Sequence, residues 1–354
     1  MSIDWSALQP HAPLSPNDAR FVPRIERPSL VERALQSDAP IAVVGPVGSG
    51  KSTSLARFAR ELSERRPNTR CVPVLRDHLR HHMPSETEAL LSADPTRLLG
   101  WCMLALISYW VAPGLISESD ALDELNIDEK RPPTEQLRLV ARATKEKLHA
   151  DRLVLLLDGL ERANTAEIQA ALDELLRFHD DFRLVAVLPA QAMYGDASAW
   201  IHERFRMHFI PAVEPTGAGR DFLREVVRRR IGETPAALEA IVDEAITQSG
   251  GIPRTLLQLV QDAGSYATLA GRELPLPEDL TLAVQDHRQS LRRLLDKDDK
   301  RALLDADGTD GSEIELPRRA RLIAHGLLLE YQTHGDLVVH PAPMLRPILA
   351  PKAA

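Results

Sequence analysis

The chain has 354 residues, of which 44% are hydrophobic and 27% are charged, and its formal net charge at pH 7 is −8. This composition is typical of a globular protein of two or three domains, and it excludes a disordered, fibrous or collagen-like chain. The aromatic content of only 4% and the negative net charge argue against a surface built throughout for nucleic acid or anionic lipid, but they leave room for a local basic face.

The N-terminal part of the chain alternates between apolar runs and helical patterns. Residues 1–20 are polar, and we expect a flexible arm there. Continuous apolar runs predict buried strands at residues 40–45, 71–75, 153–157, 183–188 and 208–213. Helices are predicted at residues 29–36, 51–65 and 165–178, and over most of 85–150. The alternation predicts an α/β fold in which a parallel sheet is covered by helices on both faces.

One segment needs a decision between a buried and a membrane-spanning helix. Residues 98–116 carry no charge, but Pro113 and Gly114 interrupt them. The uninterrupted part is shorter than the roughly 20 residues that span a bilayer, so we expect a buried helix, with a docking surface as the alternative. Cys71 and Cys102 are predicted to be buried core residues, which fits a protein of a reducing compartment. The N-terminus lacks the features of a signal peptide. We therefore expect a cytoplasmic protein with no membrane span.

The pattern changes after residue 214. Three helices are predicted within 218–270 and a fourth at 278–295, and these would form a helical lid. Short helices at 300–306 and 316–325 are followed by a hairpin with strands at 327–331 and 337–340, which suggests a winged helix. The predicted domains are the arm, a core with a helical insertion, a lid and a winged-helix-like domain, at 1–20, 21–214 (insertion about 80–150), 215–295 and 296–354.

The strongest motif lies between the first predicted strand and the following helix. It has the form G-x-x-x-x-G-K-[ST] and consists of Gly45, Pro46, Val47, Gly48, Ser49, Gly50, Lys51 and Ser52. Backbone N–H groups of such a loop, together with the helix N-terminus, bind phosphates. Lys51 would neutralise the β- and γ-phosphates and Ser52 would ligate Mg²⁺, with Thr53 as a hydroxyl neighbour. The motif predicts a nucleotide site with Mg²⁺.

A second motif follows the strand predicted at 153–157. Asp158 comes directly after this strand and would hold the hydration shell of Mg²⁺. Hydrolysis also needs a group that orients the attacking water, and Glu161 is the nearest carboxylate. Glu161 would otherwise be an ordinary first-turn acid that favours the helix dipole.

From about residue 20 to about residue 345 these motifs and their order resemble the AAA+ and STAND branches of P-loop ATPases, and also the origin-recognition-type initiators. AAA+ members usually have Glu directly after the strand Asp, whereas Gly159 stands there in this chain. The run D-G-L-E-R at 158–162 is instead similar to the form found in STAND and KAP-type ATPases. This departure favours slow hydrolysis.

The resemblance also implies roles for two arginines. Arg204, just before the fifth predicted strand, matches the segment that supplies an arginine finger to a neighbouring subunit, with Arg206 as the second choice. Arg254 lies in the run G-G-I-P-R, which resembles the sensor element of the lid and would contact the γ-phosphate. Each would otherwise be an ordinary helix-end arginine. Gln191 is the polar residue available for a sensor after the fourth strand.

Two regions are candidates for partner binding. The helical insertion at 80–150 is long for a loop between core strands, and we expect a protein partner there or on the winged helix. Arg318, Arg319 and Arg321 lie where a winged helix has its recognition helix, so DNA is an alternative partner. DNA is less favoured, because acidic and basic residues balance over 285–354.

The sequence leaves three functions open. The favoured one is a STAND-like regulatory switch that binds ATP and hydrolyses it slowly. The second is an AAA+ ATPase that assembles on DNA as a homo-oligomer, in replication or transposition. The third is a scaffold that holds nucleotide without turnover. The absence of a guanine-reading N-K-x-D run favours ATP over GTP.

Overall fold

The computed structural model describes residues 3–9, 14, 16–24, 29–74, 95–111, 131–160, 165–194, 198–232, 235–333 and 335–349. The chain divides into two compact units. One comprises Arg27–Val44 and Arg57–His208, and the other comprises Met1–Glu26, Gly45–Ala56 and Phe209–Ala354.

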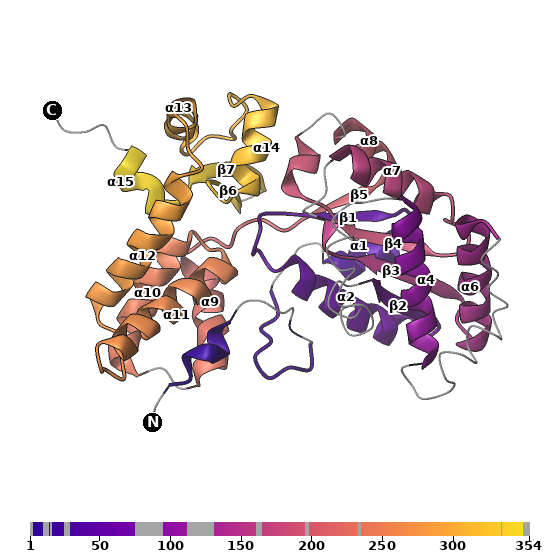
Figure 1. The fold of residues 1–354 in the computed structure, drawn as a ribbon, viewed down its shortest axis with the longest axis horizontal. Helices are drawn as coiled ribbons and strands as arrows, with labels where there is room; N and C mark the ends of the chain where they lie inside the picture. Colours follow the sequence, from indigo (N-terminus) through magenta and orange to yellow (C-terminus); the bar gives the residue numbers. More distant parts are fainter. Residues whose placement is uncertain are drawn as a thin grey trace. The chain divides into compact units, whose positions relative to one another are not determined.

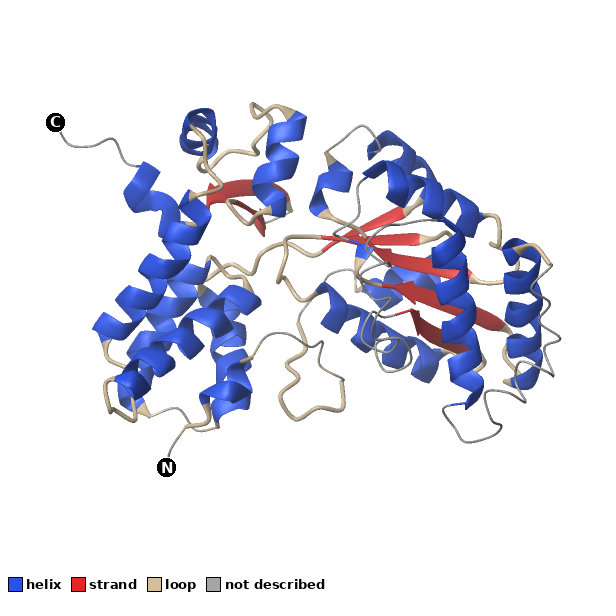
Figure 2. Ribbon diagram, viewed as in Figure 1, coloured by secondary structure: helices blue, strands red, loops and turns tan. Residues whose placement is uncertain are grey.

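A parallel five-stranded sheet forms the centre of the first unit (Figures 1 and 2). Its strands have the order β2-β3-β4-β1-β5, in which β4 lies between β1 and β3. Every residue of β1 and β4 is buried, as expected for apolar strands covered on both faces. The strands are β1 (Ile41–Val44), β2 (Thr69–Val74), β3 (Arg152–Leu157), β4 (Arg183–Val187) and β5 (Arg206–Phe209).

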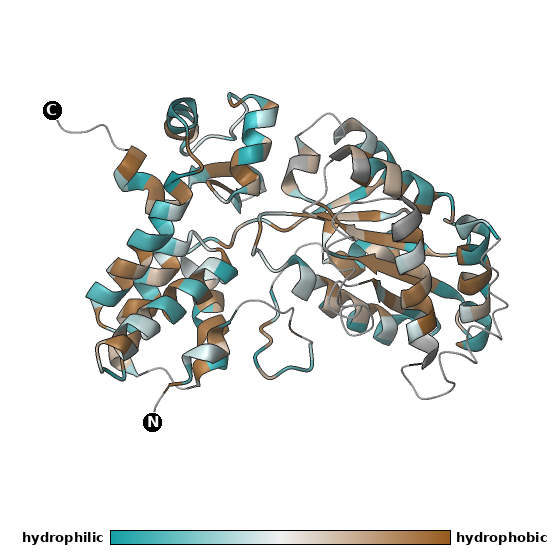
Figure 3. Cartoon of the chain, viewed as in Figure 1, coloured by the Kyte–Doolittle hydropathy of each residue, from teal (hydrophilic) through white to brown (hydrophobic). Residues whose placement is uncertain are grey.

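Helices flank this sheet, whose strands are largely hydrophobic (Figure 3). The described helices of this part of the chain are α1 (Leu30–Gln36), α2 (Lys51–Arg65), α4 (Pro95–Val111), α6 (Pro133–Lys147), α7 (Thr165–Leu176), the 3-10 helix η4 (Ala190–Met193) and α8 (Ser198–Arg204). A capping box fixes the start of α1, since the Ser29 hydroxyl accepts from the Glu32 N–H and the Glu32 carboxylate accepts from the Ser29 N–H.

The uncharged segment is a buried helix. Leu98, Trp101, Cys102 and Leu106 of α4 are each at most 5% exposed. The helix packs against α6, α7 and β2, so this face is core rather than a docking surface. No helix within the described residues is long and apolar enough to cross a membrane.

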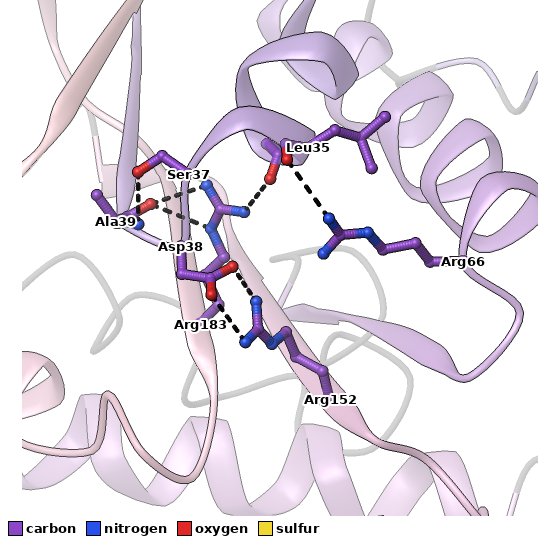
Figure 4. A network of polar contacts seen from close by, with 8 residues as sticks. Leu35, Ser37, Asp38, Ala39, Arg66, Arg152 and Arg183 are labelled. Carbon is purple, nitrogen blue, oxygen red and sulfur yellow. Dashed lines mark hydrogen bonds and ion pairs between the residues drawn. The ribbon is translucent and has the colours of Figure 1, made fainter.

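Arginines fix the segment that links α1 to β1 (Figure 4). Arg183 donates to the carbonyl oxygens of Ala34 (2.7 Å) and Ala39 (2.8 and 3.1 Å), and Arg66 donates to that of Leu35 at 3.4 Å. The carbonyls of Ala34 and Leu35 belong to the last turn of α1, where backbone acceptors lack helical partners. Cationic donors therefore stabilise this end of the helix.

The fifth strand differs from the prediction. The apolar run predicts a strand at 208–213, whereas β5 covers Arg206–Phe209. Pro211 has no N–H to donate to a neighbouring strand. The next two N–H groups donate outside the sheet, from Ala212 to the Glu330 carbonyl (2.8 Å) and from Val213 to the Gly251 carbonyl (3.1 Å).

The second unit contains the four predicted lid helices, α9 (Gly217–Ile231), α10 (Ala236–Ser249), α11 (Pro253–Leu269) and α12 (Pro277–Arg292). They enclose their own apolar core, which includes Leu223, Leu256 and Leu280. The predicted flexible arm is wrong over Trp5–Leu8. These residues form the 3-10 helix η1, and Leu8 is fully buried in the lid core.

The last part of the chain has the predicted order of helices and hairpin. Helices α13 (Lys297–Ala306) and α14 (Leu316–Ala324) precede the antiparallel strands β6 (Leu328–Thr333) and β7 (Asp336–Pro341). The 3-10 helix η5 (Pro343–Leu345) and α15 (Arg346–Leu349) follow. Met344 of η5 packs into the lid core, which attaches this segment to the lid.

Candidate nucleotide-binding site

The phosphate-binding loop begins directly after β1 and ends where α2 begins at Lys51. The Ser49 N–H donates to the Pro46 carbonyl at 3.2 Å, which closes a tight turn. The N–H groups of the first turn of α2 have no acceptor within the helix, so they can receive an anion. This arrangement fits a chain of phosphates.

The ammonium group of Lys51 contacts the backbone of the phosphate-binding loop. Its Nζ donates to the carbonyl oxygens of Gly45 (3.1 Å) and Pro46 (3.0 Å), and the residue is 6% exposed. The Ser49 hydroxyl is also buried, and it has no hydrogen-bond partner within the described part of the chain. A buried donor without a partner costs free energy, which a bound phosphate oxygen would recover. Ser52 and Thr53 follow on the first turn of α2.

The start of the lid helix α11 contacts the loop at Gly48. The Arg254 N–H points to the Gly48 carbonyl at 3.4 Å. A Cβ added to Gly48 would lie 2.6 Å from the Arg254 Cβ and 3.1 Å from the Ile252 Cγ2. Gly48 also has a φ of +84°, a conformation that side chains disfavour. The predicted sensor arginine therefore lies at the phosphate-binding loop.

The strand carboxylate lies where the sequence predicts it. Asp158 follows Leu157, the last residue of β3. Its Oδ1 accepts a hydrogen bond from the Gly159 N–H at 2.9 Å. Gly159 has a φ of +94°, so a glutamate at this position would be strained. The backbone thus gives a physical reason for glycine where AAA+ members usually have Glu. Glu161 lies outside the described residues.

The two candidate finger arginines differ in exposure. Arg204 is the last residue of α8 and is exposed. Arg206 begins β5 and is half-buried, and its N–H donates to the Pro40 carbonyl at 2.8 Å. Exposure at a helix end is the condition that a residue acting on a neighbouring subunit must meet, and Arg204 meets it. Gln191 lies on η4, but its side chain is outside the described part.

The turn between α10 and α11 belongs to the run that resembles the sensor element, and it contacts two further segments of the chain. The Tyr331 hydroxyl of β6 donates to the Gly250 carbonyl at 2.7 Å. A Cβ on Gly250 would lie 2.2 Å from the Leu329 Cδ1, and one on Gly251 would lie 1.6 Å from the Val213 carbonyl oxygen. Glycine is therefore required at both positions. The Gly-Gly pair is the signal in the sequence that points to this turn.

The arginines of α14 bind carboxylates within the same domain. Arg319 pairs with Glu330 at 3.1 Å, and these side chains are 7% and 0% exposed. Arg321 forms an ion pair with buried Asp299, and Arg318 lies 3.6 Å from the same carboxylate. Charges neutralised in this way contribute little to phosphate binding.

Comparison with known proteins identifies the family of the domain that contains the phosphate-binding loop. Residues 29–188 match the AAA ATPase domain family, and this range includes the whole loop and Asp158. The chain thus contains an AAA+ P-loop ATPase domain. No curated protein matches the chain.

Solved structures of three archaeal proteins share the fold over nearly the whole chain. Cdc6p from Pyrobaculum aerophilum has a TM-score of 0.52 at 13% identity, over 99% of this chain and 97% of that one. The Aeropyrum pernix ORC2 protein, solved as ADPNP–ADP complexes, has a TM-score of 0.50 at 13% identity, over 93% and 94%. A Walker-type ATPase of Pyrococcus abyssi has a TM-score of 0.51 at 15% identity, over 97% and 99%. At such identities the likeness shows an origin-recognition-like fold alone.

Proposed function

We propose that the protein is an ATP-driven conformational switch in which the lid reads the state of the phosphate-binding loop and passes it to the C-terminal hairpin. The observation that carries this proposal is the contact between Arg254 and Gly48. A sensor can shift a two-state equilibrium only if it interacts differently with the two nucleotide states. Arg254 lies where such a difference arises.

The relay continues from the lid to the hairpin through short contacts. Arg254 is the second residue of α11, and the Gly250–Gly251 turn precedes that helix. Tyr331 holds the turn from β6, while the neighbouring Glu330 carbonyl accepts from the Ala212 N–H. The Thr333 hydroxyl donates to the Glu214 carboxylate at 2.6 Å. A movement of α11 would therefore displace the linker at 210–214 and β6, because these contacts connect them to the turn.

The residues of the loop fit a nucleoside triphosphate with Mg²⁺. Lys51 would leave the carbonyls that it now contacts and bind the phosphates, and the Ser49 hydroxyl would gain a partner. Ser52 and Asp158 would hold Mg²⁺, which supplies positive charge to the triphosphate. The A. pernix ORC2 protein, solved with ADPNP and ADP, supports ATP as the nucleotide.

Turnover in this proposal is slow. Gly159 cannot orient water, so Glu161 takes this role. Arg204 would stabilise transition-state charge in a neighbouring subunit, which makes hydrolysis depend on assembly.

The proposed switch has three domains, which are the core at 21–214, the lid at 215–295 and a winged-helix-like domain at 296–354.

We favour a protein as the partner of the switch. The arginines of α14 that would contact DNA are paired with Glu330 and Asp299. Binding of DNA that falls steeply with salt and is lost in Arg318→Ala would overturn this choice.

Turnover measured against protein concentration tests the proposal. Lys51→Ala should abolish ATP binding, and Glu161→Gln should retain binding but abolish hydrolysis. Arg204→Ala should remove any concentration dependence, whereas Arg177→Ala, whose side chain is 72% exposed on the surface, serves as the control. Unchanged turnover in Glu161→Gln would contradict the assigned base. A wild type that binds no ATP would contradict the proposal as a whole.

A further inference from the structure

The described residues of the N-terminal segment contact both the lid and the phosphate-binding loop. Its first anchor is η1, which packs against α9 and α11 (Figure 1). Leu8 is 0% exposed in the lid core, and Trp5 lies on Gly264 of α11. A Cβ on Gly264 would be 2.2 Å from the Trp5 Cδ2. A glycine inside a helix is unfavourable, and the position of the indole explains this one.

A second anchor follows at residues 18–22. The Asp18 carboxylate accepts from the Arg20 guanidinium at 2.7 and 2.9 Å, and the Phe21 N–H donates to the Asp18 carbonyl at 2.9 Å. Arg229 of α9 donates to the Phe21 carbonyl at 2.9 Å, and Val22 packs against the lid core. The segment is therefore held to the lid at two places.

The far end of the segment contacts the phosphate-binding loop through Arg24. This half-buried guanidinium donates to the Ser49 carbonyl at 3.3 Å and to the Pro211 carbonyl at 2.7 Å. Pro211 belongs to the linker that leads from β5 to the lid. The same linker approaches the loop at Gly45, where an added Cβ would lie 2.2 Å from the Ile210 carbonyl oxygen. Arg24 thus joins the loop to the start of the lid.

The contact with the Ser49 carbonyl has a consequence for phosphate binding. Because a trans peptide unit is planar, its C=O and N–H point in opposite directions. A donor that holds the Ser49 carbonyl therefore also sets the direction of the Gly50 N–H, which lies on the other side of the same peptide unit. Backbone N–H groups of this loop are the donors that receive phosphate oxygens. Arg24 acts on the phosphate through this peptide unit.

We propose that the described residues between Ile3 and Arg24 form a strap that fastens the lid to the phosphate-binding loop, and that Arg24 is the positioning residue that orients the loop for polyphosphate. This inference rests on the proposed function, because it concerns the same nucleotide site. According to this inference, a segment that precedes the AAA ATPase domain also contributes to phosphate binding.

The test uses the full-length chain and two ligands, Mg·ATP and tripolyphosphate, which has no base. Arg24→Gln should weaken both affinities by about tenfold, the loss expected for a hydrogen bond from a charged donor. Arg24→Lys should recover part of the loss, because an ammonium retains the charge but not the planar fork. Arg177→Gln removes an arginine outside this segment, at a side chain that is 72% exposed, and it should leave both affinities unchanged.

Trp5→Ala is a second, independent variant that loosens the strap at its other end. It should lower the affinities for both ligands, as Arg24→Gln does. If Arg24→Gln does not fold, the affinities of Trp5→Ala and Arg24→Lys test the inference instead. Unchanged affinities in these variants, or a loss for ATP but not for tripolyphosphate, would overturn the inference.

Two further results separate this inference from the proposed function. If the wild-type hairpin responds to ATP but Arg24→Gln binds both ligands as tightly as Arg177→Gln does, only the strap inference fails. If Arg24→Gln lowers the affinities for both ligands but the wild-type hairpin does not respond to ATP, the strap inference holds and the proposed switch fails.

Discussion

The Arg254 N–H points to the Gly48 carbonyl oxygen at 3.4 Å, and this contact joins the lid to the phosphate-binding loop. The two residues are far apart in sequence, yet the Cα of Gly48 faces the Arg254 side chain with no space for a Cβ between them. A loop that rearranges around phosphate must therefore move α11 or lose this contact.

Gly48→Ala tests this contact. The new Cβ would lie 2.6 Å from the Arg254 Cβ at a φ of +84°, so the loop and lid must separate. We expect ATP affinity to fall by at least about tenfold, equivalent to about 1.4 kcal/mol. Gly232→Ala is the matched control, since Gly232 has a φ of +81° but no atom of the described residues within 4 Å of an added Cβ. Titration with ATP should show a loss in the first variant alone, and equal affinities would contradict the account.

The buried pair of Arg319 and Glu330 should be costly to break. Arg319→Ala would remove the ion-pair partner of Glu330, a carboxylate whose side chain is 0% exposed. We expect a loss of about 3–5 kcal/mol in the free energy of unfolding, measured with urea. Arg301→Ala, at an 86% exposed side chain, should cost less than about 0.5 kcal/mol.

Replacing both members of this pair gives the complementary result. In Arg319→Met with Glu330→Leu no buried charge remains, so most of the lost stability should return. A double variant as unstable as Arg319→Ala would show that the pair stabilises the domain by more than charge compensation.

Asp299 should make the stability of the C-terminal domain depend on pH. Burial opposes its ionisation, but the hydrogen bonds from Arg321 and from the Asp296 backbone hold its pKa below the usual 3.8. As the pH falls, the unfolded chain therefore takes up this proton first. The contribution of Asp299 is fully present well above pH 3.8 and is lost as the pH falls through the folded value.

Urea unfolding at pH 7 and pH 3 measures this effect. Asp299→Asn should lower the unfolding midpoint at pH 7 and reduce its dependence on pH. Asp310→Asn is a useful comparison, because the pKa of Asp310 is also lowered, mainly by hydrogen bonds from Ser312 and less by the charge of Arg319, yet this residue is exposed. An equal acid sensitivity in wild type and Asp299→Asn would contradict the assignment.

Gly264 and Trp5 should show coupled effects on stability. Gly264→Ala gains about 1 kcal/mol in helix propensity, but its Cβ would lie 2.2 Å from the indole, and overpacking of this kind costs about 1–3 kcal/mol. We therefore expect a net destabilisation in the wild type. In Trp5→Ala the same substitution should stabilise the protein. Thermal unfolding of the four proteins gives the cycle, and effects that simply add would contradict the docking of Trp5.

The elements that bear the site are predictable from local sequence. The apolar run at 40–45 predicts β1, and the glycine-rich motif predicts that α2 begins at Lys51. Both elements form where their own neighbouring residues favour them, so a local pattern is enough to find them. The end of β5 was misplaced because Ala212 and Val213 are apolar but donate to Glu330 and Gly251, which come much later in the chain.

The residues that connect the site to the rest of the molecule could not be predicted in this way. Arg24 contacts Pro211, 187 positions away, and Tyr331 contacts Gly250, 81 positions away. No local pattern marks either side chain, since both donate to backbone carbonyls, which every residue has. Arg318, Arg319 and Arg321 looked like a basic surface for the same reason, because their carboxylate partners are distant in sequence.

Hydrogen–deuterium exchange of the β6 strand tests the central claim most directly. The account predicts that ATP changes the exchange of residues 328–333 in the wild type. It predicts no such change in Lys51→Ala, and a much smaller one in Tyr331→Phe, which lacks the hydroxyl that contacts Gly250. Saturating ATP that protects the phosphate-binding loop but leaves residues 328–333 unchanged in the wild type would contradict it.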